Sequence, residues 1–314
     1  MSKLNLPDNL VLKLKKYKNM RYGENPHQRS AFFLSDGNPG YKQLWGIELS
    51  HNNLGDANHA WRLVSDFDEP TVAIIKHGNP SGITSRADLR EAFQLAFDSD
   101  RVSAFGGIVA VNRPPTLEMI EAMHGIFFEL LVAPDYGREV LERLKRRSSK
   151  MRVIEAEKPP MQLEFTRVFN GYLVQTPDDI KESKSKWRVV SGNSPSAKVY
   201  DDLEFAWKVV KHVKSNAIVI VKNKSMLGMG TGQPNRVNSV RLALRQAQGK
   251  LKATGAVLAS DAFFPFVDNV KLAAKAGISV IIQPGGSVND DKVVREAKKH
   301  KLTMMFTGVR HFKH

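Results

Sequence analysis

Lys76 and His77 are the side chains in this sequence whose types and placement most clearly suit chemistry. Residues 71–75 before them are apolar and mostly β-branched, which predicts a buried strand. Residues 78–82 form a cluster of turn-forming types, so the pair is expected at the carboxyl end of that strand, where open α/β sheets bind ligands. Lys76 disfavours protonation of His77, which predicts a neutral base. A surface lysine beside a hydrogen-bonded histidine is the alternative interpretation.

Two further stretches bear on ligand binding. Residues 20–28 (MRYGENPHQ) display Arg21 and Tyr22 on a predicted loop, and a guanidinium and a phenol can both donate to phosphate oxygens. Glycines at 228, 230 and 232 lie between a predicted strand and helix. Their spacing is not that of a dinucleotide site, and no acidic residue follows about 20 residues on, so we predict a tight loop with exposed amides.

The composition limits the classes of function. With 314 residues, 42% of them hydrophobic and 25% charged, the chain can fold as one large or two ordinary domains. No apolar run approaches the roughly 20 residues that span a bilayer, and the first residues lack a signal-peptide core, so we expect a cytoplasmic protein without membrane contact. The sequence has no cysteine and no His-x-x-x-His spacing, so no metal site is expected.

The charge points to anionic partners. Lys and Arg number 47 against 32 Asp and Glu, a formal net charge of +15. The densest basic cluster, residues 145–152, contains no aromatic side chain that could stack on bases, so we interpret it as a solvated face. Nucleic acid is therefore not the expected partner, whereas a small phosphorylated or polycarboxylate substrate fits the same charge.

Strands and helices are predicted to alternate, and the order of elements repeats once along the chain, which indicates a layered α/β fold. A stretch rich in Lys, Ser, Asp and Pro, residues 176–199, places a boundary near residue 185. We therefore expect two units, residues 1–185 with an N-terminal arm and residues 186–314. The predicted strands are residues 71–75, 108–111 and 130–133 in the first unit and 217–221, 256–259, 278–282 and 303–306 in the second.

Ten motifs, spread in order over nearly the whole chain, carry a resemblance to a known family. They are MRYGENPHQ (20–28), NNLGDA (52–57), IIKHGNPSG (74–82), SAFGGIVAVNRP (103–114), LLVAP (130–134), FAWKVVKHVKSNAIV (205–219), GMGTGQPNRV (228–237), SDAFFPFVDNV (260–270), IIQPGGS (281–287) and TGVRHFKH (307–314). The chain resembles the AICAR transformylase domain of the bifunctional purine biosynthesis enzyme that also carries IMP cyclohydrolase. The family's cyclohydrolase domain has no match, so the resemblance implies formyl transfer without ring closure, and a separate cyclohydrolase in the pathway.

The resemblance implies transfer of a formyl group from the cosubstrate 10-formyltetrahydrofolate to the 5-amino group of 5-aminoimidazole-4-carboxamide ribonucleotide (AICAR), with no metal required. That amine is a poor nucleophile because its lone pair is conjugated, so a base and a stabilised oxyanion are needed. By similarity, His77 accepts the amine proton, Lys76 stabilises the oxyanion, and Asn216 orients the formyl oxygen or His77. Adjacent side chains diverge on a strand, so Lys76 and His77 share a site only if the chain bends between them or each faces a different ligand.

Further binding residues are implied by similarity. The ribonucleotide phosphate is assigned to Arg21 and Arg310, because a guanidinium can bind a phosphate dianion through two hydrogen bonds. Folate is placed at Phe263, Phe266 and Asp268, where an aromatic ring can pack on the pterin and a carboxylate can accept from its N–H groups. Ordinary core packing is the alternative interpretation of the two phenylalanines. The substrate-binding residues implied are Arg21, Tyr22, Asn53, Gly106, Glu129, Arg236 and Arg310. The folate-binding residues implied are Phe263, Phe266, Asp268 and Asn269.

The family also implies an assembly and a fold. Its members are homodimers with each active site at the subunit boundary, and they consist of two tandem cytidine-deaminase-like, three-layer α/β units. The zinc signature of the deaminases is missing here, so zinc deamination is not expected. The alternative function is that of a non-catalytic basic protein that binds a nucleotide or RNA on the same scaffold.

Overall fold

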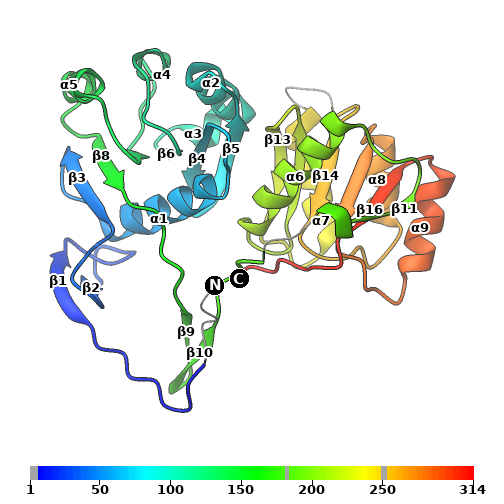
Figure 1. Cartoon of the computed structure of the whole chain (residues 1–314), viewed down its shortest axis with the longest axis horizontal. Helices are drawn as coiled ribbons and strands as arrows, with labels where there is room; N and C mark the ends of the chain where they lie inside the picture. Colours follow the sequence, from blue (N-terminus) through cyan, green and yellow to red (C-terminus); the bar gives the residue numbers. More distant parts are fainter. Residues whose placement is uncertain (1–5, 181–183, 249–252) are drawn as a thin grey trace.

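The structure is a computed structural model that describes residues 6–180, 184–248 and 253–314. Its main feature is a mixed sheet of twelve strands, seen in Figure 1 as two side-by-side groups. In sheet order the strands are β3 (Tyr41–Trp45), β8 (Arg152–Ala156), β7 (Leu130–Ala133), β6 (Ile108–Val111), β4 (Thr71–Lys76), β5 (Asn79–Ser85), β13 (Ser225–Gly230), β12 (Ile218–Lys222), β14 (Val257–Ser260), β15 (Val280–Gln283), β16 (Thr303–Phe306) and β11 (Arg188–Ser191).

The two halves of the sheet have the same topology. β4 is antiparallel to β5 and β6, and β6, β7 and β8 run parallel. β12, β13, β14, β15 and β16 repeat this arrangement, and an antiparallel strand, β3 or β11, ends each half. β5 and β13 join the halves, where the hydroxyls of Thr84 and Ser225 lie 2.8 Å apart. The expected α/β fold with a repeated order of elements is confirmed.

Helices cover both faces of the sheet, because the central strands are buried on both sides. In β4, Ala73 and Ile75 face one layer of helices while Val72 and Ile74 face the other, which explains the unbroken apolar run. One face carries α1 (His51–Ser65) and α6 (Ala197–Lys211). The other carries α2 (Leu89–Ser99), α3 (Arg101–Ala104), α4 (Leu117–Ala122), α5 (Arg138–Arg147), α7 (Arg236–Gln248), α8 (Asp268–Lys275) and α9 (Asp290–Lys299).

A single hydrophobic core under α1 and α6 extends across both halves. Its centre includes the rings of Phe67 and Phe205, whose centroids are 5.1 Å apart. The two layers on the opposite face form separate cores, one in each half. The shared core therefore fixes α1 and α6 relative to each other, and with them the hairpins that they cover.

Two hairpins and an arm lie outside the sheet. β1 (Lys15–Met20) pairs with β2 (Ser30–Leu34), and β9 (Glu164–Val168) pairs with β10 (Gly171–Gln175), followed by the short 3₁₀ helix η1 (Lys184–Lys186). In Figure 1 the arm and the β9–β10 hairpin extend away from both groups of helices. They leave large apolar side chains in solvent, among them Leu6, Val11, Phe169, Tyr172 and Leu173.

Several local predictions are wrong. Residues 79–82 are not a turn but the first part of β5, and Gly228 and Gly230 lie in β13 rather than in a loop. These strand glycines are needed for helix packing, since a Cβ on Gly82 would lie 1.8 Å from Ala96 O and one on Gly228 would lie 2.2 Å from Ala243 O. The unit boundary near residue 185 stays a prediction.

Within the described ranges, no helix is long and apolar enough to cross a bilayer. The same residues contain no group of three or more His, Asp or Glu side chains placed to hold a metal ion.

Candidate functional site

Lys76 and His77 lie at a two-residue hairpin turn between β4 and β5. Lys76 pairs with Asn79, so His77 and Gly78 form the turn, with φ angles of 51° and 71°. Two successive positive φ angles are typical of a type I′ hairpin turn, and Gly78 adopts this conformation without strain. The chain therefore bends between Lys76 and His77, which is the condition for both side chains to serve one site.

Asp56, on α1, binds the backbone of this turn. Its Oδ2 accepts from the amide of His77 at 3.2 Å and its Oδ1 accepts from the amide of Gly78 at 2.8 Å. Burial raises the pKa of Asp56, and the two amide donors partly oppose that shift. Sequence reasoning missed Asp56, although it belongs to the motif NNLGDA.

The ammonium of Lys76 lies beside the chain segment that leads into β6. Lys76 Nζ donates to Phe105 O at 2.7 Å. The next residue, Gly106, has a φ of 71°, and its amide donates to Phe127 O at 2.8 Å. Lys76 and the predicted substrate-binding Gly106 are therefore neighbours.

A second set of polar contacts, in which Glu129 is close enough to affect the pKa of Asp56, extends to the N-terminal motif. Asn53 Nδ2 donates to Glu129 Oε2 at 2.6 Å, and Arg152 Nη1 lies 3.6 Å from the same oxygen. Burial lowers the pKa of Arg152, Glu129 opposes this shift, and the nearby charge of Arg21 adds to it. Arg21 Nη2 donates to the hydroxyl of Tyr22 at 2.9 Å. Arg152 was predicted on a solvated face; that is wrong, because its side chain is buried against Glu129.

A second set of predicted residues lines a cavity of about 260 Å³ between the ends of β12, β14 and the start of α8. The predicted residues that line it are Asn216, Arg236, Phe263, Phe266, Asp268 and Asn269. Phe312, which sequence reasoning missed, completes the apolar part of the wall. Arg310 lies over the ring of Phe312, with its guanidinium carbon 4.4 Å from the ring centre.

Asn269, in the wall of this cavity, has a buried acceptor without a partner among the described residues. The residue is 1% exposed, and its Nδ2 donates to Phe266 O at 3.3 Å and to Asp268 Oδ1 at 3.0 Å. Its Oδ1 has no hydrogen-bond partner in the described part of the chain, a situation that costs about 1–3 kcal/mol. Phe266 is 64% exposed, so core packing does not account for it; Phe264 is the ring that fills the core.

Arg236 and Asn216 are bonded to each other at the edge of the cavity. Arg236 Nη2 donates to Asn216 Oδ1 at 2.6 Å, while Nη1 pairs with the fully buried Asp261. Burial lowers the pKa of Arg236, and Asp261 opposes that shift. Asn216 Nδ2 donates to Gln233 O at 2.8 Å. The contacts of Arg236 thus orient the amide of Asn216.

The predicted residues therefore fall into two groups. The turn group is Arg21, Tyr22, Asn53, Lys76, His77, Gly106 and Glu129, joined by the contacts of Asp56 and Arg152. The cavity group is Asn216, Arg236, Phe263, Phe266, Asp268, Asn269 and Arg310. Thr231 Oγ1 donates to Asn79 Oδ1 at 2.9 Å, which links the loop before α7 to the strand after the turn. Arg21 and Arg310, the two predicted phosphate ligands, thus belong to different groups.

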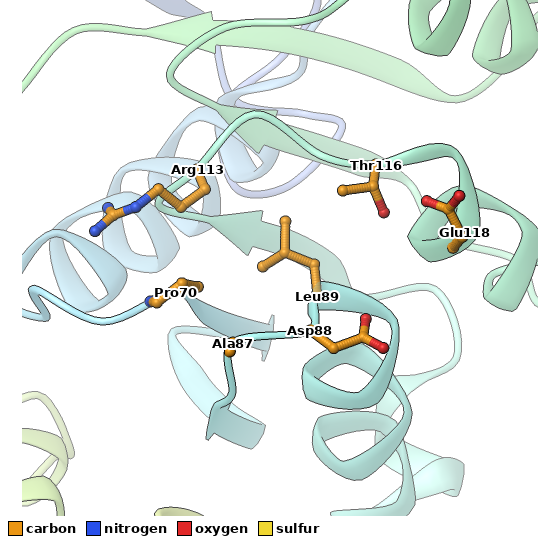
Figure 2. A pocket seen from close by; sticks show the side chains of 7 residues that line it. All are labelled: Pro70, Ala87, Asp88, Leu89, Arg113, Thr116 and Glu118. Atoms are coloured by element: carbon orange, nitrogen blue, oxygen red, sulfur yellow. The ribbon is translucent and has the colours of Figure 1, made fainter.

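A larger cavity, of about 430 Å³, lies at the opposite end of β4 and contains none of the predicted residues. Its polar groups already serve the fold: Asp88 accepts from Arg90 N and Thr116 accepts from Met119 N at two helix starts. In Figure 2 the guanidinium of Arg113 and the carboxylate of Glu118 lie on opposite sides of Leu89. We therefore place the candidate site at the two groups rather than in this cavity.

Comparisons with solved structures give small overlaps. A dCMP deaminase from the cyanophage S-TIM5 in apo form is 17% identical, with a TM-score of 0.26 over 35% of this chain and 98% of that chain. RibD of Acinetobacter baumannii is 18% identical, with a TM-score of 0.25 over 35% of each chain. Overlaps of this size carry no conclusion about this chain.

Comparisons of sequence are far stronger. The bifunctional purine biosynthesis proteins PurH of Streptococcus thermophilus and Streptococcus pneumoniae are each 47% identical over 319 aligned residues, which cover 98% of this chain. The chain spans 62% of the length of these relatives. Residues 1–246 match the model of the family described as AICARFT/IMPCHase bienzyme. The chain therefore belongs to the AICARFT/IMPCHase bienzyme family.

Proposed function

We propose that this chain transfers the formyl group of 10-formyltetrahydrofolate to the 5-amino group of AICAR, giving the formylated ribonucleotide (FAICAR) and tetrahydrofolate for purine biosynthesis. The observation that carries the proposal is the 260 Å³ cavity, since six residues selected from the sequence for this reaction line it together. Membership of a family of purine biosynthesis enzymes supports the same reaction class.

In this proposal the turn group supplies the proton transfers. The exposed imidazole of His77 accepts the proton that the amine loses as it attacks the formyl carbon. The ammonium of Lys76 stabilises the negative charge on the formyl oxygen and donates the proton that N10 of the departing folate needs. Asn216, whose amide is oriented by Arg236, directs the formyl oxygen or His77.

The ribonucleotide is assigned mainly to cationic and amide side chains. Arg21 and Arg310 bind the phosphate, with the Tyr22 hydroxyl beside Arg21 as a further donor. Asn53, Gly106, Glu129 and Arg236 bind the rest of the molecule. The net charge of +15 favours association with such an anionic substrate.

The folate is assigned to the cavity group. The exposed ring of Phe266, with Phe263 beside it in the wall, offers an apolar face to the pterin. The pterin carries amino and ring N–H donors, and the unpartnered Oδ1 of Asn269 together with the carboxylate of Asp268 supplies acceptors for them. A buried acceptor without a protein partner is the kind of group that a ligand donor satisfies.

We further propose that two copies of the chain form a homodimer and that each active site combines the turn group of one copy with the cavity group of the other. Arg21 and Arg310, both assigned to one phosphate, belong to different groups. The cavity is somewhat smaller than the roughly 300–1,000 Å³ of typical ligand sites, as expected if a second copy supplies one wall. Exposed apolar residues of the arm and the β9–β10 hairpin, such as Val11 and Phe169, offer surface for such an interface.

No observation favours the alternative of a non-catalytic RNA-binding protein. Part of the basic cluster at residues 145–152 already has partners within the protein, since Arg147 donates to Ile126 O at 2.5 Å and Arg152 pairs with Glu129. Fewer of its charges are therefore available to phosphates in solution.

The experiment that tests the proposed reaction mixes the purified chain with AICAR and 10-formyltetrahydrofolate. Release of tetrahydrofolate is followed by absorbance, and IMP is assayed in the same tube. We expect release that depends on AICAR and no IMP from this chain. A folded chain that releases no tetrahydrofolate would contradict the proposal.

A further inference from the structure

The turn that carries His77 has an internal counterpart in the second half of the chain. Residues 56–79 align with residues 202–225 without a gap, an offset of 146 positions. Six residues of the first stretch recur in the second, and they are Asp56, Ala60, Trp61, Val64, Ile74 and Lys76, matching Asp202, Ala206, Trp207, Val210, Ile220 and Lys222. The two stretches occupy equivalent places in the fold, each running from a helix of the shared layer into a hairpin.

The counterpart repeats the hydrogen bonds as well as the sequence. Asp202 accepts from the amides of Asn223 and Lys224 at 2.9 and 2.6 Å, and both of these residues have positive φ angles, 51° and 50°. Lys222 Nζ donates to Thr254 O at 2.9 Å, as Lys76 Nζ does to Phe105 O. A carboxylate that binds the turn and a lysine that binds a carbonyl are thus features of both halves, whereas the histidine occurs in one.

The two turns differ in what else fixes them. The second turn has further contacts with the first half: Arg86 Nη1 donates to Asn223 O at 2.6 Å, and Lys224 Nζ pairs with Glu69 at 2.6 Å. The His77 turn has, besides Asp56, a bond from Asn79 Nδ2 to His77 O at 3.2 Å, and Asn79 Oδ1 accepts from Thr231 Oγ1 of the second half at 2.9 Å. In the described part of the chain the imidazole of His77 makes no hydrogen bond of its own. Its direction therefore depends on the backbone of the turn.

From this difference we infer that Asp56 is a positioning residue for His77. Asp56 holds the two turn amides and thereby fixes the position and direction of the imidazole, while touching neither substrate itself. The titratable groups that face Asp56 are His77, in the turn that Asp56 binds, and Glu129, just before β7. In the second half the equivalent carboxylate, Asp202, has a structural role only, because its turn presents Asn223 and no histidine. The inference rests on the proposed function, in which His77 is the base.

The test compares Asp56→Asn with the matched control Asp202→Asn. In each variant one carboxylate oxygen that faces an amide becomes an NH₂ group, so each loses an acceptor to the turn. Since a misplacement of about 1 Å can cost about 100-fold, we expect Asp56→Asn to lower kcat about 10- to 100-fold. The KM for AICAR should stay within about threefold of the wild-type value, because the variant keeps the contacts that bind the substrate before it reacts. Asp202→Asn should leave kcat within about threefold of the wild type.

A second readout does not depend on turnover. With selectively labelled histidine, the imidazole C–H resonance of His77 is assigned by its loss in His77→Gln. We expect one sharp resonance in the wild type and in Asp202→Asn, and a broadened or split resonance in Asp56→Asn. Equal kcat in wild type and Asp56→Asn, or an unchanged His77 resonance, would overturn the inference while the proposed function stands. A wild type without turnover would instead remove the proposed function, and the resonance alone would then decide the inference.

Discussion

At the scale of single residues, His77 is what distinguishes one hairpin turn from the other. In both turns the two central residues have positive φ angles and an aspartate on the preceding helix accepts from their amides, but the second turn presents Asn223. We expect His77→Ala to abolish turnover while leaving the affinity for AICAR within about tenfold, because the variant lacks the proposed base and keeps the proposed phosphate ligands. Turnover is measured by tetrahydrofolate release and affinity by calorimetry. Asn223→Ala is the matched control and should keep its activity; an active His77→Ala would exclude His77 from the chemistry.

The buried pair of Arg236 and Asp261 gives a prediction about stability. Both side chains are almost fully buried, at 4% and 0% exposure. Arg236→Met leaves Asp261 as an uncompensated buried charge, which costs about 3–5 kcal/mol of unfolding free energy. Urea unfolding of the two proteins measures this difference. The double change Arg236→Met with Asp261→Leu removes both charges and should recover part of the loss; a single variant as stable as the wild type would show that the pair does not matter for folding.

Sequence reasoning at this scale works where a motif is contiguous. Lys76 and His77 follow a strand that is visible in the pattern, and they lie at its end. Asp56 and Arg152 escaped prediction because their roles depend on partners 21 and 23 residues away, namely His77 and Glu129, which only the fold brings near. Arg152 in particular sits in a basic run that resembles a solvated face, and its burial comes from its position as the first residue of β8.

At the scale of elements, two strand glycines set how closely α2 and α7 approach the sheet. A Cβ on Gly82 would lie 1.8 Å from Ala96 O, too close to be relieved without moving α2. We expect Gly82→Ala to lower the unfolding free energy by roughly 3 kcal/mol or more, as overpacking in a core does. Gly55→Ala on α1, where a Cβ meets open space, should be neutral or stabilising by about 0.5–1 kcal/mol. Thermal unfolding compares the three proteins, and a Gly82→Ala as stable as Gly55→Ala would refute this packing.

The elements that could be predicted are the long apolar ones. The central strands β4, β6, β7, β12, β14, β15 and β16 were all recognisable because both of their faces are buried. The edge strands β3 and β11 were missed, since edge strands carry charged and polar residues such as Lys42 and Arg188. The inner strand β8 was missed because it begins at Arg152, in a basic run. The glycines of β5 and β13 were interpreted as turn residues, because the sequence alone does not distinguish a glycine needed for helix packing from one needed for a turn.

At the scale of the whole molecule, two histidines at the junction of the halves predict how stability depends on pH. His59 Nε2 donates to His212 O at 3.0 Å, and His212 Nε2 donates to Asp66 Oδ2 at 2.8 Å. Burial lowers the pKa of His59 to about 3 and that of His212 to about 4, the latter against the opposing effect of Asp66. In the unfolded chain the two histidines therefore bind protons near the ordinary histidine pKa of about 6.5, whereas in the folded chain they stay neutral at that pH.

Since the unfolded state binds more protons in this range, the free energy of unfolding should fall as the pH drops from about 6.5 towards about 4. Urea midpoints at pH 7 and pH 5 measure the change. In His59→Gln, which keeps a donor for His212 O, the loss between the two pH values should be smaller than in the wild type. Identical losses in the two proteins would mean that His59 does not stay neutral in the folded chain.

The assignment of one reaction to two groups of residues from different copies is tested most directly by mixed dimers. His77→Ala and Arg310→Ala subunits are expressed together with different affinity tags, and the mixed dimer is purified through both. If each site combines the turn group of one copy with the cavity group of the other, one of the two sites keeps every residue, and about half of the wild-type formyl transfer should return.

Mixed dimers of His77→Ala and Lys76→Ala subunits are the control, because these residues belong to the same group and every site then lacks one of them. We predict transfer by the first mixture and none by the control or by either parent variant. A purified mixed dimer of His77→Ala and Arg310→Ala without activity would contradict the proposed shared site.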